Sequence, residues 1–249
     1  MTVRVALLFP DLLGTYGDSG NAVILTQRLR WRGIDAEMVT IRSGETVPDD
    51  CQLYVVGGGE DRPQAQAARQ LGAGSAGGPL RSAVAGGAVV LAVCAGLQIL
   101  GRTFIGPDGQ KTDGLGLVDC STVPGTGRRM VGEIVVDADP DLGLPPLTGY
   151  ENHAGVTTVE PGSLPFGRVR VGSGNGGESG HDGVYRGRVL GTYLHGPVLA
   201  RNPALADLLL GWAVGDLEPL DDSEAESLRK ERFGAVAASS RRSRWAGRR

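Results

Sequence analysis

The chain has 249 residues, 41% hydrophobic and 21% charged, with a formal net charge of −3; this length allows one large core, and the composition argues against disorder. The charge provides no positive field that would attract nucleic acid, so a small molecule or another protein is the expected partner. Three cysteines without a CxxC pair argue against a disulfide framework or a zinc site, and the lack of a signal segment or membrane-length apolar run favours the cytoplasm.

The first half of the chain alternates short apolar runs with helical segments. Residues 3–9 are apolar and β-branched up to Pro10, and hydrophobic residues then recur at helical spacing until Gly33. The alternation continues, with strands expected at 3–9, 36–41, 53–56 and 88–93, and helices at 21–32, from 63, at 79–85 and at 95–100. Strands that are apolar throughout indicate a parallel sheet covered on both faces, which predicts a doubly wound α/β fold.

The second half is richer in β-strand patterns. Strands are expected at 130–136, 148–151, 168–171, 184–186 and 189–194, followed by helices at 204–214 and 223–233. No repeat or linker is visible, so residues 1–236 are interpreted as one domain with a mostly parallel sheet flanked by helices and a β-rich second half. Residues 237–249 form a basic tail expected to be disordered, because 239–249 hold five arginines, one tryptophan and no acid.

Cys94 stands where an apolar strand meets a helix. By residue type alone, such a cysteine is more often a buried and inert side chain. A nucleophile on a sharp strand-to-helix turn, however, projects above the sheet edge, and the helix N-terminus favours the thiolate. Ala95 and Gly96 are small enough for this turn, so we predict that Cys94 is a nucleophile and that Cys51 and Cys120 are structural.

A thiolate hydrolase needs a base, and the chain has three histidines. His195 ends the strand expected at 189–194 and should lie at the sheet edge where ligands bind in open α/β folds. We predict that His195 is the base. His153 also follows a strand and is interpreted as a supporting residue, whereas His181 lies among glycines and should be solvated.

Three consecutive glycines follow the strand expected at 53–56. Backbone N–H groups there can approach a ligand closely, so Gly58 or Gly59 together with the Ala95 amide could form an oxyanion hole; a flexible connecting loop is the alternative. No GxxxxGK[ST] motif occurs in the chain, so ATP-driven chemistry would need another subunit.

Five motifs together point to a family. The chain resembles the cobyric-acid-synthase-like branch of class I glutamine amidotransferases and, within it, the glutaminase subunits of lipid II isoglutaminyl synthases. The resemblance covers residues 3–233 and rests on YGDSGN at 16–21, GGGEDR at 57–62, CAGLQ at 94–98, YENH at 150–153 and YLHGP at 193–197.

This resemblance implies one half of a heterodimeric enzyme without a cofactor of its own. The chain would hydrolyse L-glutamine, and a Mur-ligase-like partner would use ATP and the ammonia to convert D-glutamate of the lipid II stem to D-isoglutamine. By the same similarity Cys94 is the nucleophile and His195 the base and then the acid. An arginine before Met130, either Arg128 or Arg129, would hold the substrate, and Gln98 is a further candidate for binding it.

The chain departs from the class I pattern at two positions. Ala92 replaces a glycine that many members carry two residues before the cysteine, and its small side chain should do little harm. Pro197 replaces a glutamate that many members carry two residues after the histidine. Either Cys94 and His195 work as a dyad, or a carboxylate from elsewhere orients His195; we favour the second, with the partner subunit as a source.

Three further functions fit parts of this pattern. A glutaminase for corrinoid synthesis is the nearest enzymatic candidate, although those synthetases carry a fused nucleotide-binding domain that this chain lacks. A catalytically silent partner that binds glutamine is the second candidate. A cysteine hydrolase with a non-amide substrate is the third.

Overall fold

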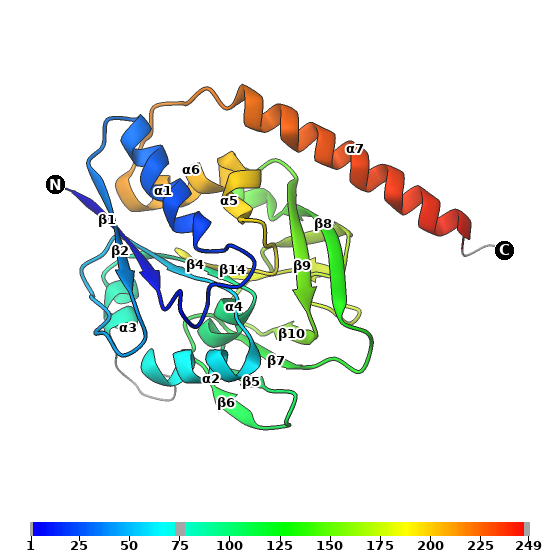
Figure 1. The fold of residues 1–249 in the computed structure, drawn as a ribbon, viewed down its shortest axis with the longest axis horizontal. Coiled ribbons are helices and arrows are strands. Elements are labelled where there is room, and N and C mark those ends of the chain that lie inside the picture. The colour runs from blue at the N-terminus through cyan, green and yellow to red at the C-terminus, as the bar shows by residue number, and fades with distance from the viewer. Residues whose placement is uncertain (1, 73–77, 247–249) are drawn as a thin grey trace.

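The centre of the molecule is a six-stranded sheet with the strand order β13-β14-β4-β3-β1-β2 (Figure 1). The computed structural model describes residues 2–72 and 78–246. The strands are parallel except for β13, which runs antiparallel to β14. Their bounds are Val3–Leu8 (β1), Ala36–Ile41 (β2), Leu53–Val56 (β3), Val89–Val93 (β4), Val184–Arg186 (β13) and Val189–Thr192 (β14).

The burial of these strands follows their position in the sheet. Every residue of β3 and β4 is buried, as expected for strands covered on both faces, whereas β2 at the edge mixes buried and exposed residues. The predicted doubly wound α/β fold is confirmed. Helices α1, α5 and α6 lie on one side of the sheet and α2, α3 and α4 on the other (Figure 1), with bounds Gly20–Trp31 (α1), Asp61–Gln70 (α2), Pro79–Ala85 (α3), Ala95–Leu100 (α4), Val198–Arg201 (α5) and Pro203–Val214 (α6).

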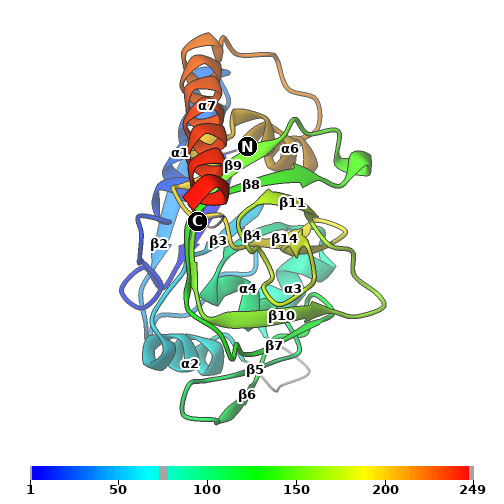
Figure 2. The same ribbon diagram turned by 90° about the vertical axis from the view of Figure 1, so that its right-hand side faces the viewer.

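Two smaller sheets, each with four strands, form most of the second half. Both lie on the same side of the molecule, beside β14 (Figures 1 and 2). One has the order β10-β7-β5-β6, with bounds Gly155–Val159 (β10), Cys120–Pro124 (β7), Thr103–Ile105 (β5) and Lys111–Asp113 (β6). The other has the order β12-β11-β8-β9, with bounds His181–Asp182 (β12), Gly167–Val171 (β11), Met130–Ala138 (β8) and Leu147–His153 (β9).

Several element boundaries differ from the sequence prediction. The strand expected at 189–194 ends at Thr192, where its hydroxyl donates to the buried carboxylate of Asp182 and the chain leaves the sheet. The helix expected from Pro63 begins at Asp61, because a proline is tolerated in the first helical turn, where its missing N–H has no acceptor to lose.

The C-terminal helix α7 spans Ser223–Ala246 and runs out along the right of the molecule in Figure 1. It is longer than the helix predicted at 223–233. The helix therefore continues beyond residue 237 to Ala246, the expectation of a disordered tail from residue 237 stays a prediction, and residues 247–249 lie outside the described residues. The division into a domain and a tail at residue 236 stays a prediction.

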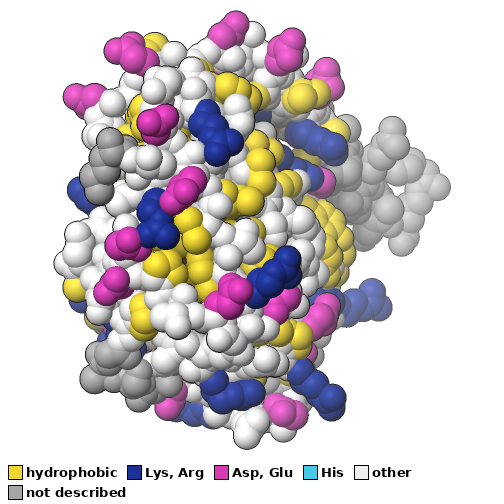
Figure 3. Space-filling view, turned by 60° about the vertical axis from the view of Figure 1, so that its left-hand side comes forward, with side chains coloured by type: hydrophobic (Ala, Val, Ile, Leu, Met, Phe, Trp, Pro, Cys, Tyr) yellow, Lys and Arg dark blue, Asp and Glu magenta, His cyan; other side chains and the backbone are white. Residues whose placement is uncertain are grey.

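Within residues 2–72 and 78–246, no helix combines the length and the apolar character needed to cross a membrane. On the face shown in Figure 3, basic and acidic side chains are interspersed with hydrophobic ones and neither sign of charge dominates. This face therefore has no basic patch of the kind that binds nucleic acid.

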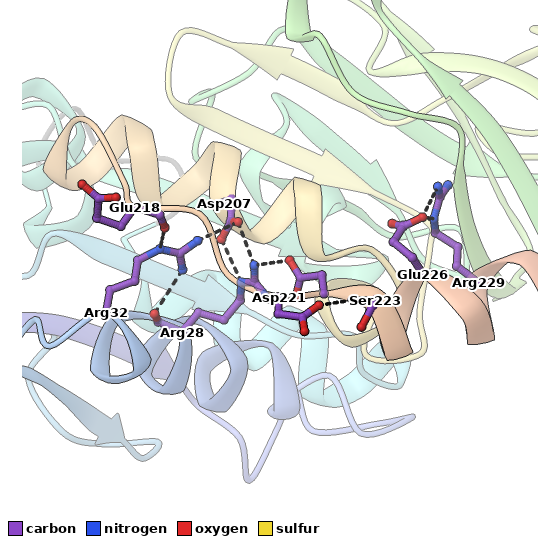
Figure 4. Close-up of polar contacts among 9 residues, drawn as sticks. Arg28, Arg32, Asp207, Glu218, Asp221, Ser223, Glu226 and Arg229 are labelled. Atoms are coloured by element: carbon purple, nitrogen blue, oxygen red, sulfur yellow. Dashed lines mark hydrogen bonds and ion pairs between the residues drawn. The ribbon is translucent and has the colours of Figure 1, made fainter.

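A buried cluster of ion pairs ties α1 to the C-terminal part of the chain (Figure 4). The Arg28 guanidinium donates two hydrogen bonds to Asp207 of α6, at 2.8 and 2.7 Å, and two to Asp222, at 2.7 Å each. Only 4% of the Arg28 side chain is exposed. Burial lowers the pKa of Arg28, but its bonds to both aspartates outweigh this and raise it above its usual value.

Removing this guanidinium should destabilise the protein strongly. We expect Arg28→Ala to lower the free energy of unfolding by about 3 kcal/mol, because it leaves Asp222 in a largely buried cluster without its cation and Asp207 with Arg32 alone. Arg4→Ala is the matched control, because the Arg4 side chain is 29% exposed and pairs with the exposed carboxylates of Glu37 and Asp50. Chemical denaturation should show a loss below about 1 kcal/mol for this variant. Equal losses in the two variants would contradict this role of the cluster.

Candidate active site

Cys94 lies between β4 and α4 in a backbone conformation that is rare for a side-chain-bearing residue, with φ 51° and ψ −105°. Such strain clusters at functional sites, where the surrounding structure holds it in place. The turn needs small neighbours: a Cβ on Gly96 would lie 2.5 Å from the carbonyl oxygen of Val56. The predicted strand-to-helix elbow is present, and it brings Cys94 to the carboxyl edge of the sheet.

His195 and Asp18 form a buried pair next to this elbow. The Nδ1 atom of His195 lies 2.9 Å from the Oδ2 atom of Asp18, and the side chains are 1% and 0% exposed. The Gly58 N–H donates to the same carboxylate oxygen at 2.9 Å. The contact agrees with the favoured alternative, a carboxylate from elsewhere, but its suggested source in the partner subunit is corrected to Asp18 of this chain.

Gly58 is the point at which the three side chains meet. A Cβ on Gly58 would lie 2.7 Å from Cε1 of His195, 3.0 Å from Oδ2 of Asp18 and 3.5 Å from Cβ of Cys94. Cys94 and His195 therefore flank the same glycine. Since any side chain at this position would push the imidazole away, Gly58 is required for the arrangement.

The loop between β1 and α1 places Asp18. Tyr16 and Gly17 both have positive φ, at 62° and 76°, and turn the chain inward just before the aspartate. At the start of α1, a Cβ on Gly20 would lie 2.5 Å from Cγ of Pro197. Pro197, which replaces the glutamate of many class I members, thus packs against the N-terminus of α1, two residues from the carboxylate that contacts His195.

The surroundings of His195 favour its charged form. Burial lowers the pKa of this imidazole. The hydrogen bond to Asp18 and the electrostatic effect of the neighbouring Cys94 outweigh burial and raise the pKa to about 9. Its backbone is held by β9, since Tyr150 and His195 exchange hydrogen bonds of 3.1 and 2.8 Å. The buried Nε2 atom has no hydrogen-bond partner in the described part of the chain, which leaves it available for proton transfer.

The structure changes the predicted oxyanion hole. Because the Gly58 N–H donates to Asp18, it is not available for a ligand, and the prediction for Gly58 is wrong in this respect. Gly59 and Ala95 both line the pocket that contains Cys94. Ala95 is the first residue of α4, so its N–H has no acceptor within the helix and can bind a ligand oxygen.

This pocket has a volume of about 90 Å³, a size that limits it to small ligands. Of the two candidate arginines, Arg129 lines it and Arg128 does not. Asn152 accepts a hydrogen bond from the Arg129 guanidinium and donates one to the Tyr16 hydroxyl. The Tyr16 ring in turn packs edge-on against His195, with ring centroids 4.9 Å apart. Gln98, the third predicted substrate-binding residue, also lines the pocket.

The remaining histidines and cysteines occupy supporting positions. His153 stacks on Tyr193 with ring centroids 3.8 Å apart, and its Nδ1 lies 3.0 Å from the Gly155 carbonyl oxygen. Burial lowers its pKa to about 4, so it is neutral at physiological pH. His181 is exposed, as expected. Cys51 and Cys120 are buried, free and absent from the residues that line the Cys94 pocket.

Comparison with known proteins identifies the family. Residues 4–203 match the CobB/CobQ-like glutamine amidotransferase domain. The chain belongs to this family. It is a glutamine amidotransferase enzyme subunit, and the resemblance found in its sequence motifs is confirmed.

Two relatives of this glutamine amidotransferase match over most of their length. It is 38% identical over 227 residues to lipid II isoglutaminyl synthase (glutamine-hydrolyzing) subunit GatD of Staphylococcus aureus (strain N315), covering 89% of this chain and 90% of that one. It is 32% identical to the subunit of the same name from Streptococcus pneumoniae, covering 85% and 80%. A cobyric acid synthase of Brucella anthropi is 36% identical, but the match covers 65% of this chain and 32% of that enzyme.

Solved structures support the fold assignment. A crystal structure of a glutamine amidotransferase matches with a TM-score of 0.56 at 20% identity, covering 84% of this chain and 98% of that one. The structure of PurLQS from Thermotoga maritima matches with a TM-score of 0.55 at 17% identity, covering 86% and 96%. At such low identity these matches show a shared fold.

Replacing the Asp18 carboxylate should change the titration of His195. We expect Asp18→Asn to lower the pKa of His195 from about 9, because the neutral amide no longer stabilises the imidazolium. The folded-state pKa lies above the unfolded value of about 6.5, so this pair stabilises the protein fully below about pH 6.5 and less as pH rises to about 9. NMR titration of the histidines and denaturation at several pH values measure both effects.

Asp11→Asn is the control for this titration, because Asp11 lies in the same loop, is exposed, and accepts hydrogen bonds from Ser43 and not from His195. It should leave the His195 titration unchanged. If His195 titrates alike in the wild type and in Asp18→Asn, the carboxylate does not act on the imidazole.

Proposed function

We propose that this chain hydrolyses L-glutamine at Cys94 and supplies the ammonia to a synthetase that amidates the peptide stem of lipid II. The observation that carries the proposal is the convergence of Cys94, His195 and Asp18 around Gly58 in a glutamine amidotransferase domain, with Cys94 lining a pocket beside them. This arrangement contains a nucleophile, a base and a carboxylate that orients the base.

In the first step the Cys94 thiolate attacks the carboxamide carbon of glutamine and forms a carbon–sulfur bond. The carbonyl oxygen becomes an oxyanion, and we assign its binding to the N–H groups of Gly59 and Ala95, because both residues line the pocket. His195 then donates its Nε2 proton to the amide nitrogen, the carbon–nitrogen bond breaks, and ammonia leaves. The product on the enzyme is a γ-glutamyl thioester.

In the second step water hydrolyses the thioester. Neutral His195 accepts a proton from the water as its oxygen bonds to the acyl carbon, and glutamate leaves as the carbon–sulfur bond breaks and the thiolate returns. Asp18 holds Nδ1 of the imidazole and stabilises the charge that the ring carries in each cycle. Arg129 and Gln98, which line the same pocket, are the candidates that hold the glutamine main-chain groups and side chain.

The acceptor and the partner rest on the relatives. Both GatD relatives are named as glutamine-hydrolysing subunits of lipid II isoglutaminyl synthase, and this chain covers 90% and 80% of their lengths. The share of each relative's length that the chain matches favours lipid II over corrinoid precursors as the acceptor, because the chain matches only 32% of a cobyric acid synthase. A Mur-ligase-like partner would activate the D-glutamate carboxylate with ATP, for which this chain has no GxxxxGK[ST] motif.

Ammonia must reach the activated carboxylate without a proton to act as a nucleophile. In water at neutral pH most of it would become ammonium, so the proposed heterodimer should pass it through the protein. Copurification tests the partner directly: a Mur-ligase-like protein bound to this chain supports the proposal, and a corrinoid synthetase in its place contradicts it.

Removing the nucleophile should abolish turnover. We expect Cys94→Ala to lower the rate of glutamine hydrolysis by at least about 10³-fold, the scale seen when a catalytic nucleophile is lost. Cys51→Ala is the control, because Cys51 is buried outside the pocket, and it should keep wild-type turnover. A chloroketone analogue of glutamine should alkylate the wild type at Cys94, as detected by mass spectrometry. Full turnover in Cys94→Ala would exclude the proposed mechanism.

A further inference from the structure

A continuous chain of hydrogen bonds runs from α2 along the wall of the Cys94 pocket. Nε2 of Gln64 donates to Oε1 of Gln98 at 2.8 Å, and Nε2 of Gln98 donates to the Tyr193 hydroxyl at 3.2 Å. The chain continues from the Tyr193 hydroxyl to Thr157, at 2.6 Å, and from Thr157 to Thr122, at 2.7 Å. It therefore connects α2 and α4 with the segment after β14 and with β10 and β7.

Because most of its members are buried, this chain of hydrogen bonds has a defined geometry. Gln64 is 4% exposed and Tyr193 is 0% exposed, although both carry polar groups. A buried amide or hydroxyl without a partner is costly, so each of these groups must keep its hydrogen bond. The Tyr193 ring is held in addition by its stacking on His153. The two partners of Gln98, Gln64 and Tyr193, are thus fixed, and Gln98 is held between them.

The hydrogen bonds to Gln64 and Tyr193 show which way the Gln98 amide faces in the structure. Its oxygen accepts from Gln64, so its nitrogen must point to the Tyr193 side. An amide nitrogen carries two hydrogens, and only one is needed for the hydroxyl. Gly155 lies beside this nitrogen, where a Cβ would come within 2.9 Å of it. Because Gly155 has no side chain, it does not cover this nitrogen with a Cβ, and Gln98 and Gly155 both line the pocket.

We propose that Gln64 and Tyr193 are positioning residues that hold the Gln98 amide with its N–H toward the pocket, as a donor to an oxygen of bound glutamine. The proposal rests on the glutaminase function proposed above. Glutamine presents acceptor oxygens in its α-carboxylate and its carboxamide, and either matches a fixed N–H donor. The pocket wall would then favour a ligand with a hydrogen-bond acceptor next to the Gln98 N–H. Gln64 would affect substrate affinity without contacting the reacting atoms.

The substitution Gln64→Glu tests this orientation. A carboxylate at position 64 can only accept hydrogen bonds, so it should pull the Gln98 nitrogen toward α2 and turn the Gln98 oxygen toward Tyr193 and the pocket. We expect KM for glutamine to rise by about tenfold, with kcat changed by less than about threefold, because an interaction with the ground state is lost. Gln64→Leu removes the donor without forcing the amide to turn and should raise KM less.

Gln66→Glu is the control for a negative charge added to α2, because Gln66 is exposed on the same helix and does not line the Cys94 pocket, whereas Gln64 does. It should keep the wild-type KM and kcat. Tyr193→Phe removes the second hydrogen bond of Gln98 but keeps the ring that stacks on His153, and it should also raise KM. The double variant Gln64→Glu with Tyr193→Phe should raise KM by less than the product of the single effects, since both act through Gln98.

Two results would overturn this inference. One is a wild-type KM in a folded Gln64→Glu variant; the second is a fall in kcat with unchanged KM, which a general loss of structure at the site would produce. Thermal unfolding of each variant shows whether it is folded. The glutaminase proposal fails separately, because in that case the wild type itself would neither hydrolyse glutamine nor react with the chloroketone analogue.

Discussion

The active site depends on one buried hydrogen bond, between the Asp18 carboxylate and the His195 imidazole. Both side chains are removed from water, and an isolated charge at such a buried position would be costly. The Asp18 carboxylate makes the charged form of His195 favourable. The Gly58 N–H adds a second donor to the same carboxylate oxygen. The pair therefore keeps the imidazole oriented and charged with Nε2 free, as a proton donor to departing ammonia requires.

The fold explains how these distant residues meet. Asp18 follows β1, Gly58 follows β3, Cys94 follows β4 and His195 follows β14, and all four strands are parallel neighbours in one sheet. Their carboxyl ends therefore share one edge, where open α/β folds bind ligands. The smaller sheets complete the site from the opposite side, because β9 holds the backbone of His195 and supplies Asn152.

The sequence is informative where local pattern determines structure. Cys94 and His195 could be predicted because each directly follows an apolar run, and the fully buried strands identified the parallel sheet. Asp18 could not be assigned, because it contacts a residue 177 positions away and no spacing rule connects a loop after β1 with the end of β14. Its motif at 16–21 contained the signal, but only the contact with His195 in the folded structure gives it a role.

Further features escaped prediction for related reasons. The short strands β5, β6 and β7 include polar residues, as in the sequence KTD of β6, so they have no apolar run to reveal them. The neighbouring Arg128 and Arg129 are indistinguishable in sequence, and they differ only because Arg129 reaches Asn152 and the pocket. The Gly58 amide was assigned to the oxyanion hole because its acceptor, Asp18, is distant in sequence.

This chain carries its own carboxylate for His195, that of Asp18. Measuring glutamine turnover by the isolated chain, in the wild type and in Asp18→Ala, tests the role of Asp18 most directly. We predict turnover by the wild type alone and a loss of at least about 10²-fold in Asp18→Ala. A wild type that is inactive until the partner subunit is added, together with an Asp18→Ala variant as active as the wild type in that complex, would contradict it.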